Sequence, residues 1–108
     1  MSDKQLQKEL TAFVAGLLKK AKCDHAGNCL TMSGLIRNYL AIVYRMERME
    51  CMVTSTMVQQ GKKKINHYYL LRVKDGIIID CTASQFKFPD GKQMPLVYIG
   101  EKPNFYLF

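Results

Sequence analysis

The sequence lacks any apolar run approaching the roughly 18 residues that a membrane-spanning helix requires. Its first ten residues, MSDKQLQKEL, also lack the apolar stretch of a signal peptide. There is no tryptophan, so the aromatic residues are six tyrosines and five phenylalanines. Low-complexity segments, internal repeats and a domain linker are absent as well. We therefore expect one soluble domain over residues 1–108, without membrane contact and by default cytoplasmic.

Acidic residues are scarce: nine stand against 16 lysines and arginines, which gives a net charge of +7. A positive charge favours acidic partners, and nucleic acid is one of them. However, the basic residues are scattered along expected helix faces and in the turn Lys62-Lys63-Lys64, without a nucleic-acid-binding motif. We therefore expect a protein or peptide substrate rather than nucleic acid; the oligomeric state stays open.

The four cysteines, Cys23, Cys29, Cys51 and Cys81, are expected to be free thiols in a reducing compartment. One alternative is structural zinc, because Cys23, His25 and Cys29 share one loop, with Cys51 or Cys81 as a distant fourth ligand. Neither cysteine pair has the short spacing of a zinc knuckle, and no second ligand pair exists. We therefore expect no metal and no cofactor.

Two helices are predicted in the first half of the chain. From Leu6 to Ala21 apolar residues recur at helical spacing, and Ser2 with Gln5 forms a plausible capping box. A second helix opens at or near Cys29, with Leu35 and Val43 on its apolar side. Its expected buried stripe consists of Cys29, Ser33, Ile36, Leu40 and Val43.

After about Glu50 the period changes from helical to two, which is typical of strands. The final segment, Phe105 to Phe108, is either a last strand or a flexible end. Because hairpin-type turns separate the runs, they predict an antiparallel meander. The fold class is therefore α+β, with two N-terminal helices packed on a small antiparallel sheet. The predicted strands are Met52–Gln59, Ile65–Val73, Gly76–Cys81 and Leu96–Ile99.

Three residues on different elements could form a thiol catalytic site. A helix start stabilises a thiolate, and Cys29 is placed there. His67 lies on a strand, and Asp80 ends the next strand. A turn centred on Asp75-Gly76 would pair Leu71 with Asp80, and we expect Asp80 to be a diagonal neighbour of His67, two residues along on the same face. Each residue also has a purely structural interpretation: packing for the cysteine and histidine, and strand termination for the aspartate.

Three strings carry a family resemblance: Gly27 to Ser33 (GNCLTMS), His67 to Leu70 (HYYL), and Asp75 to Phe86 (DGIIIDCTASQF). They resemble sequence blocks of compact papain-fold and transglutaminase-like domains, including bacterial and phage toxin or effector domains. The resemblance covers roughly Gly27 to Phe86, and its most specific piece is the Asp-x-Thr-x-x-Gln-Phe block.

The resemblance implies a papain-like core and a role for each matching residue. Cys29 would be the nucleophile, His67 the general base and acid, and Asp80 the residue that orients His67. Gln85, with Thr82, would shape the loop below Asp80. Papain has a glutamine oxyanion donor six residues before its nucleophile. Cys23 stands at that position here, so Asn28 or a nearby backbone N–H would substitute.

We therefore expect a cysteine-dependent hydrolase or acyltransferase that acts on amide bonds, as a peptidase or glutamine deamidase. The alternative is a catalytically inactive papain-like binding module that engages a partner protein. In that case the methionines between Arg45 and Met52 could line the contact surface. Thiol reactivity separates the two interpretations, because an ordinary thiol favours the binding module.

Overall fold

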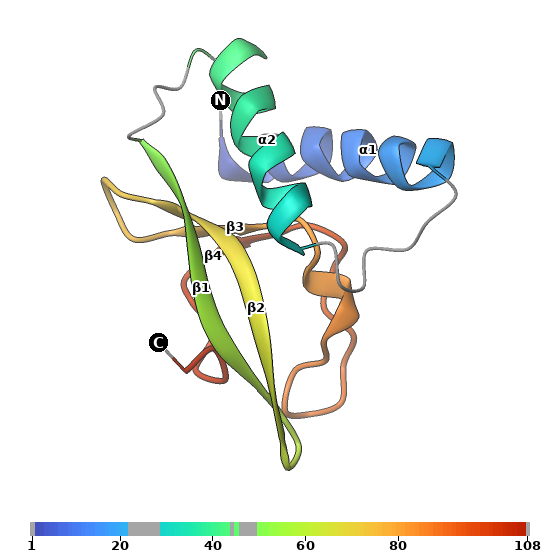
Figure 1. Cartoon of the computed structure of the whole chain (residues 1–108), viewed down its shortest axis with the longest axis vertical. Helices are drawn as coiled ribbons and strands as arrows, with labels where there is room; N and C mark the ends of the chain where they lie inside the picture. Colours follow the sequence, from blue (N-terminus) through green and yellow to red (C-terminus); the bar gives the residue numbers. More distant parts are fainter. Residues whose placement is uncertain (1, 22–28, 44, 46–49, 108) are drawn as a thin grey trace.

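The computed structural model describes residues 2–21, 29–43, 45 and 50–107, with the backbone alone at residues 20, 21, 29 and 30. Two helices precede a four-stranded antiparallel sheet in the order β1-β2-β3-β4. Figure 1 shows the helices together at one end of the molecule and the β1–β2 hairpin reaching to the other. The predicted α+β class and antiparallel meander are therefore confirmed. Within the described residues, neither helix is long and apolar enough to cross a bilayer.

Helix α1 spans Asp3–Ala21 and begins at the predicted cap. The hydroxyl of Ser2 accepts a hydrogen bond from the backbone N–H of Gln5 at 3.1 Å, which satisfies one of the free donors of the first turn. The helix thus starts three residues before the apolar pattern does. Its buried stripe consists of Leu6, Leu10 and Val14.

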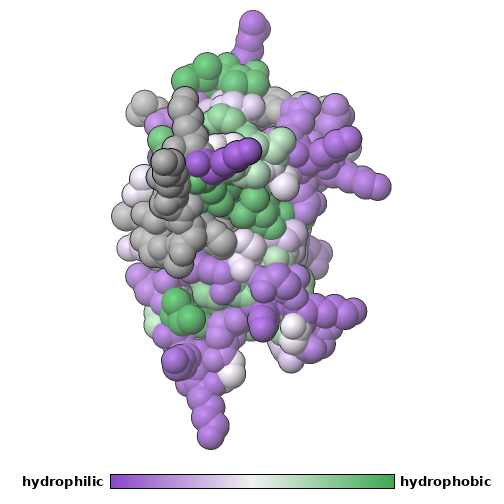
Figure 2. Space-filling model, turned by 90° about the vertical axis from the view of Figure 1, so that its right-hand side faces the viewer, coloured by the Kyte–Doolittle hydropathy of each residue, from purple (hydrophilic) through white to green (hydrophobic). Residues whose placement is uncertain are grey.

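Helix α2 spans Cys29–Val43 and begins at the residue that the apolar pattern predicted, but its buried face is narrower. Met32, Ile36 and Leu40 follow one another at intervals of four and are all buried. Leu35 and Val43 lie outside this stripe, with 48% and 52% of their surface exposed, so their predicted burial is wrong. Figure 2 shows apolar side chains gathered toward the top of the molecule, the height at which α2 ends in Figure 1.

The strands are β1 (Cys51–Gln60), β2 (Lys63–Arg72), β3 (Ile78–Asp80) and β4 (Tyr98–Gly100). The pairing between β2 and β3 differs from the predicted one by two residues: Leu71 lies opposite Ile78, and Leu70 opposite Ile79. Continued by one residue, this ladder puts Asp80 opposite Tyr69, two positions from His67. The predicted pairing would have left the two residues four positions apart.

The wider turn between β2 and β3 explains the shift. The backbone N–H of Arg72 donates to the carbonyl oxygen of Ile77 at 2.8 Å, so four residues rather than two lie between the paired positions. The carboxylate of Asp75 accepts hydrogen bonds from the guanidinium of Arg72 and from the backbone N–H of Ile77 at 3.2 Å. These side-chain contacts stabilise a longer turn than a two-residue hairpin.

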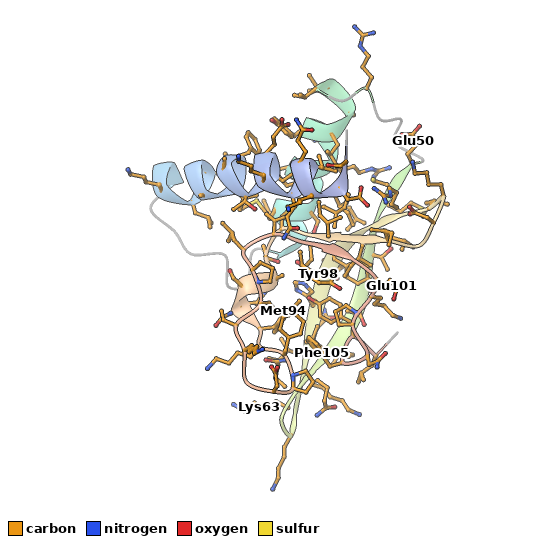
Figure 3. All side chains as sticks on the ribbon, turned by 180° about the vertical axis from the view of Figure 1, so that it is seen from behind. Glu50, Lys63, Met94, Tyr98, Glu101 and Phe105 are labelled. Carbon is orange, nitrogen blue, oxygen red and sulfur yellow. The ribbon has the colours of Figure 1, made fainter. Side chains whose placement is uncertain are left out.

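Because strand residues alternate, the sheet has two buried faces. The face under the helices, which we call the helix-side core, includes Leu70 and Ile79 of the sheet and Met32, Ile36 and Leu40 of α2. The opposite face, which we call the loop-side core, contains Val58, Tyr69, Ile78, Ala83, Phe86, Met94, Phe105 and Tyr106. Figure 3 shows Met94 and Phe105 below α1, seen from behind.

The segment of residues 105–107 runs along the outer edge of β1. The backbone N–H of Gln59 donates to the carbonyl oxygen of Phe105 at 2.8 Å, and that of Leu107 donates to Met57 at 2.9 Å. Between them, Tyr106 forms an isolated bridge with Val58. Of the two alternatives for this segment, strand-like pairing is therefore observed as far as Leu107.

Candidate active site

His67 and Asp80 are in direct contact in the loop-side core. Nε2 of His67 lies 2.7 Å from Oδ2 of Asp80, and neither side chain has any exposed surface. The contact follows from the register, because diagonal neighbours on one face of an antiparallel pair are within reach of a long or aromatic side chain. The predicted proximity of these two residues is therefore observed, although through a different pairing of the strands.

The carboxylate of Asp80 is surrounded by donors. Oδ2 accepts a second hydrogen bond from the hydroxyl of Tyr106 at 2.5 Å. Oδ1 accepts one from the backbone N–H of Thr82 at 3.0 Å. A buried charge without such partners would be very costly, so these bonds allow an ionised carboxylate inside the core.

Gln85 fixes the protonation pattern of the His67 ring. It lies on a short 3-10 helix, η1 (Ala83–Gln85), and its Nε2 donates to the carbonyl oxygen of Thr82 at 3.1 Å. The same nitrogen lies 3.3 Å from Nδ1 of His67 and must donate there too. Nδ1 therefore carries the lone pair and Nε2 carries the proton that points at Asp80.

Aromatic rings enclose the imidazole. The ring of Phe86 meets it edge-on with centroids 4.8 Å apart, and that of Tyr106 does so at 5.8 Å. Both rings belong to the loop-side core. The imidazole is fully buried, and the low-dielectric surroundings strengthen the hydrogen bond between His67 and Asp80.

Cys29 is the first residue of α2, at the predicted helix start. Its side chain lies outside the described residues, as does the whole of Asn28. The structure therefore brings together His67, Asp80 and Gln85 of the predicted site and gives only the backbone position of Cys29.

Helix α2, which begins at Cys29, and the ring of His67 lie on opposite faces of the sheet. The helix packs against β1 and β2 on the helix-side core, whereas His67 points to the other face. However, β3 ends at Asp80, so η1 rather than a strand lies beside His67. Met32 of α2 and Cys81, which follows β3, both belong to the helix-side core. At its Nδ1 side, His67 is therefore covered by Gln85 of η1.

The two cysteines whose side chains are described are unsuited to nucleophilic chemistry. Cys51 and Cys81 are free and buried. Burial raises the pKa of Cys51. Burial, and then the negative charge of Asp80, raise the pKa of Cys81. Both thiols therefore stay protonated and protected near neutral pH.

The zinc alternative involves residues outside the described part of the chain: Cys23, His25 and the side chain of Cys29. Among the residues that the structure does describe, no group of three or more His, Cys, Asp or Glu side chains could hold a metal ion. Cys51 and Cys81, the distant ligands of that alternative, are buried in the helix-side core.

Tyr106 is the site residue that the sequence did not reveal. It lies 26 positions from Asp80, in a segment that carries no strand periodicity long enough to predict its partner. Its contact depends on the pairing of residues 105–107 with β1, which is a tertiary feature. The only signal in the sequence is a pair of aromatic residues, Phe105 and Tyr106, after the last predicted strand.

Comparisons with protein-family models, with curated proteins and with solved structures find no match for this chain.

Proposed function

We propose that this chain is a cysteine-dependent enzyme with a papain-like core that acts on amide bonds, with Cys29 as nucleophile and the His67–Asp80 pair as its proton-transfer unit. The observation that carries the proposal is the buried 2.7 Å contact between Nε2 of His67 and Oδ2 of Asp80. In this contact Nε2 orients the imidazole ring, so Nδ1 is the nitrogen that exchanges protons.

The chemistry follows from these roles. Nδ1 takes the proton of the Cys29 thiol, and the thiolate attacks the amide carbonyl carbon to form a C–S bond. The imidazolium then gives its proton to the leaving nitrogen as the C–N bond breaks, which leaves a thioester. Water or an amine then gives a proton to Nδ1 and attacks the thioester carbonyl carbon, and the C–S bond breaks as the imidazolium returns that proton to the sulfur of Cys29. The outcome is hydrolysis, deamidation or acyl transfer, depending on which amide and which acceptor enter.

Two features of the fold support this assignment. The backbone N–H groups at the start of α2 and the positive end of its dipole stabilise a thiolate at its first residue, Cys29. Gln85 holds Nδ1 in its unprotonated form, the form that a general base needs. The amide of Gln85 has to give up this position when the thiol approaches, so the described geometry is a resting state of the proposed site.

The test is the pH dependence of alkylation at each cysteine, measured by mass spectrometry. At pH 6 a thiol of ordinary pKa, about 8.5, is less than about 1% thiolate, so rapid labelling of Cys29 there identifies an activated nucleophile. We expect His67→Gln, which keeps a donor for Asp80, to abolish this rapid labelling. His25→Gln is the matched control, because His25 is the only other histidine, and it should leave the rate unchanged.

A second candidate function is a non-catalytic binding module on the same scaffold. The observation that favours it is that His67 is completely buried with both ring nitrogens hydrogen-bonded, as in a structural histidine. In that case Cys29 would label at the rate of an ordinary thiol, and His67→Gln would lower stability without changing that rate. The alkylation profile therefore decides between the two functions.

A further inference from the structure

The hydroxyl of Tyr106 and Nε2 of His67 share a single oxygen of Asp80. The hydroxyl is 2.5 Å from Oδ2, and the ring nitrogen is 2.7 Å from the same atom. We propose that Tyr106 is a positioning residue of the site, which fixes the Asp80 carboxylate against His67 and regulates how strongly the pair holds a proton. Its catalytic meaning rests on the proposed thiol chemistry.

The backbone and the packing leave the Tyr106 ring little freedom. Pairing of residues 105–107 with β1 sets its height along the sheet. Phe86 and Tyr69 pack against the ring, with centroids 6.3 Å and 5.9 Å away, and the sulfur of Met94 lies 3.8 Å from the hydroxyl. The hydroxyl is therefore held against Asp80 before any substrate arrives, which is the preorganisation that a positioning residue provides.

Tyr106 is a permanent donor to Asp80. Besides His67, three titratable groups lie near Asp80: Tyr106, Tyr69 on β2, and Cys81, whose side chain belongs to the helix-side core. Burial, followed by the charge of Asp80, raises the pKa of each of these three groups, so all three stay protonated at neutral pH. Of the three, Tyr106 is the one whose side chain donates a hydrogen bond to the Asp80 carboxylate in the described residues.

The hydroxyl of Tyr106 and the Nε2–H group of His67 compete for the negative charge on Oδ2 of Asp80. When Nδ1 of His67 takes up a proton, the imidazolium depends on the negative charge of Asp80, and the bond from Tyr106 withdraws part of that charge. Tyr106 therefore makes the imidazolium a readier proton donor to the leaving group. Without the hydroxyl, the whole charge on Oδ2 would act on the ring.

The experiment is an NMR titration of the His67 ring in Tyr106→Phe, which keeps the aromatic ring and removes only the hydroxyl. We expect the imidazole to titrate at a higher pH in this variant than in the wild type, because the full negative charge on Oδ2 of Asp80 then acts on the ring. The matched control is Tyr69→Phe, another buried phenol of the same core, which should shift the titration by less than about a third of that shift. His25→Gln assigns the signals.

A titration that does not move in Tyr106→Phe, moves downward, or moves equally in Tyr69→Phe would overturn the proposal, since a structural role alone predicts lower stability with an unchanged titration. If Tyr106→Phe does not fold, the wild-type protein gives the answer. A slowly exchanging Tyr106 hydroxyl proton with a nuclear Overhauser effect to the Nε2 proton of His67 supports the role, and its absence refutes it.

These readouts do not involve Cys29, and the titration can be repeated in Cys29→Ser. An unreactive Cys29 together with a shifted titration would therefore refute the proposed enzyme and leave the role of Tyr106 intact. A reactive Cys29 with an unshifted titration would support the proposed enzyme and refute the role of Tyr106.

Discussion

Arg72 and Asp3 form a two-pronged ion pair, although they lie 69 positions apart: Nη1 of Arg72 is 2.7 Å from Oδ1 of Asp3, and Nη2 is 3.0 Å from Oδ2. The same guanidinium donates to Asp75, with Nη2 2.7 Å from Oδ2. Hydrogen bonds to Asp3 and Asp75 raise the pKa of Arg72. One side chain thus joins the first turn of α1 to the turn that sets the register of β3.

We expect Asp3→Asn to lower the free energy of unfolding by about 1 kcal/mol or less, because solvent screens a pair of which Asp3 is half exposed. Urea unfolding followed by circular dichroism measures this. The matched control is Asp90→Asn, whose partner Lys92 is 3.9 Å away, with both side chains mostly exposed. It should have no measurable effect, and equal losses in the two variants would contradict the assigned role of Arg72.

The contribution of this ion pair should disappear in acid. Hydrogen bonding to Arg72 lowers the pKa of Asp3 and of Asp75 below the ordinary value of 3.8. A lowered folded-state pKa means that the stabilisation is present above pH 3.8 and is lost as the pH falls through the folded-state pKa. The difference in unfolding free energy between wild type and Asp3→Asn should therefore shrink toward zero below that pH. A difference that stays constant down to pH 2 would rule out this electrostatic origin.

Two isoleucines of α2 give a matched test of its buried stripe. Ile36 has no exposed surface, whereas Ile42 is 78% exposed. Ile36→Ala should cost about 2–5 kcal/mol of unfolding free energy, because it leaves a cavity in the helix-side core. Ile42→Ala should be close to neutral. Comparable losses would mean that α2 packs by a different face.

Cys51 and Cys81 should resist iodoacetamide in the folded protein at pH 8. Both are buried, and burial raises the pKa of each. In urea both should label at the rate of an unstructured thiol, because unfolding exposes the thiols and removes the burial that raises their pKa. Fast labelling of either residue under native conditions would show that the helix-side core opens more readily than its packing implies.

Asp80→Asn should lower the unfolding free energy by about 1–3 kcal/mol, because the new NH₂ group would face other hydrogen-bond donors. Whichever way the amide is oriented, its NH₂ group replaces an oxygen that now accepts a hydrogen bond, from Thr82 at one position or from His67 and Tyr106 at the other. The variant keeps the size of the side chain, so cavity formation does not contribute. Chemical denaturation measures the loss, and an unchanged midpoint would argue against an ionised Asp80.

Local patterns predicted much of this fold. Helical spacing gave both helices, and the capping pair Ser2–Gln5 fixed the start of the first. Alternation from Met52 onward and the turn residues gave the order of the strands. These features depend on neighbours within a few positions, which is the range over which a sequence pattern carries information.

Contacts between distant segments were harder to predict from the sequence. The two-residue error in the β2–β3 register arose because the side chain of Asp75 stabilises a wider turn. The exposure of Leu35 depends on how closely α2 lies on the sheet, and apolar spacing alone does not determine that. His67 and Asp80 were predictable as neighbours because one hairpin connects them, whereas Tyr106 reaches them through a separate pairing.

The pairing of residues 105–107 with β1 also protects the sheet from self-association. β1 is an edge strand, and an uncovered edge presents free N–H and C=O groups on which another chain can add a strand. The hydrogen bonds at Met57 and Gln59 occupy these groups near the hairpin end. The segment that places Tyr106 beside Asp80 therefore also covers this edge, which hinders aggregation. A substitution that weakens the pairing of this segment with β1 would affect solubility as well as the site.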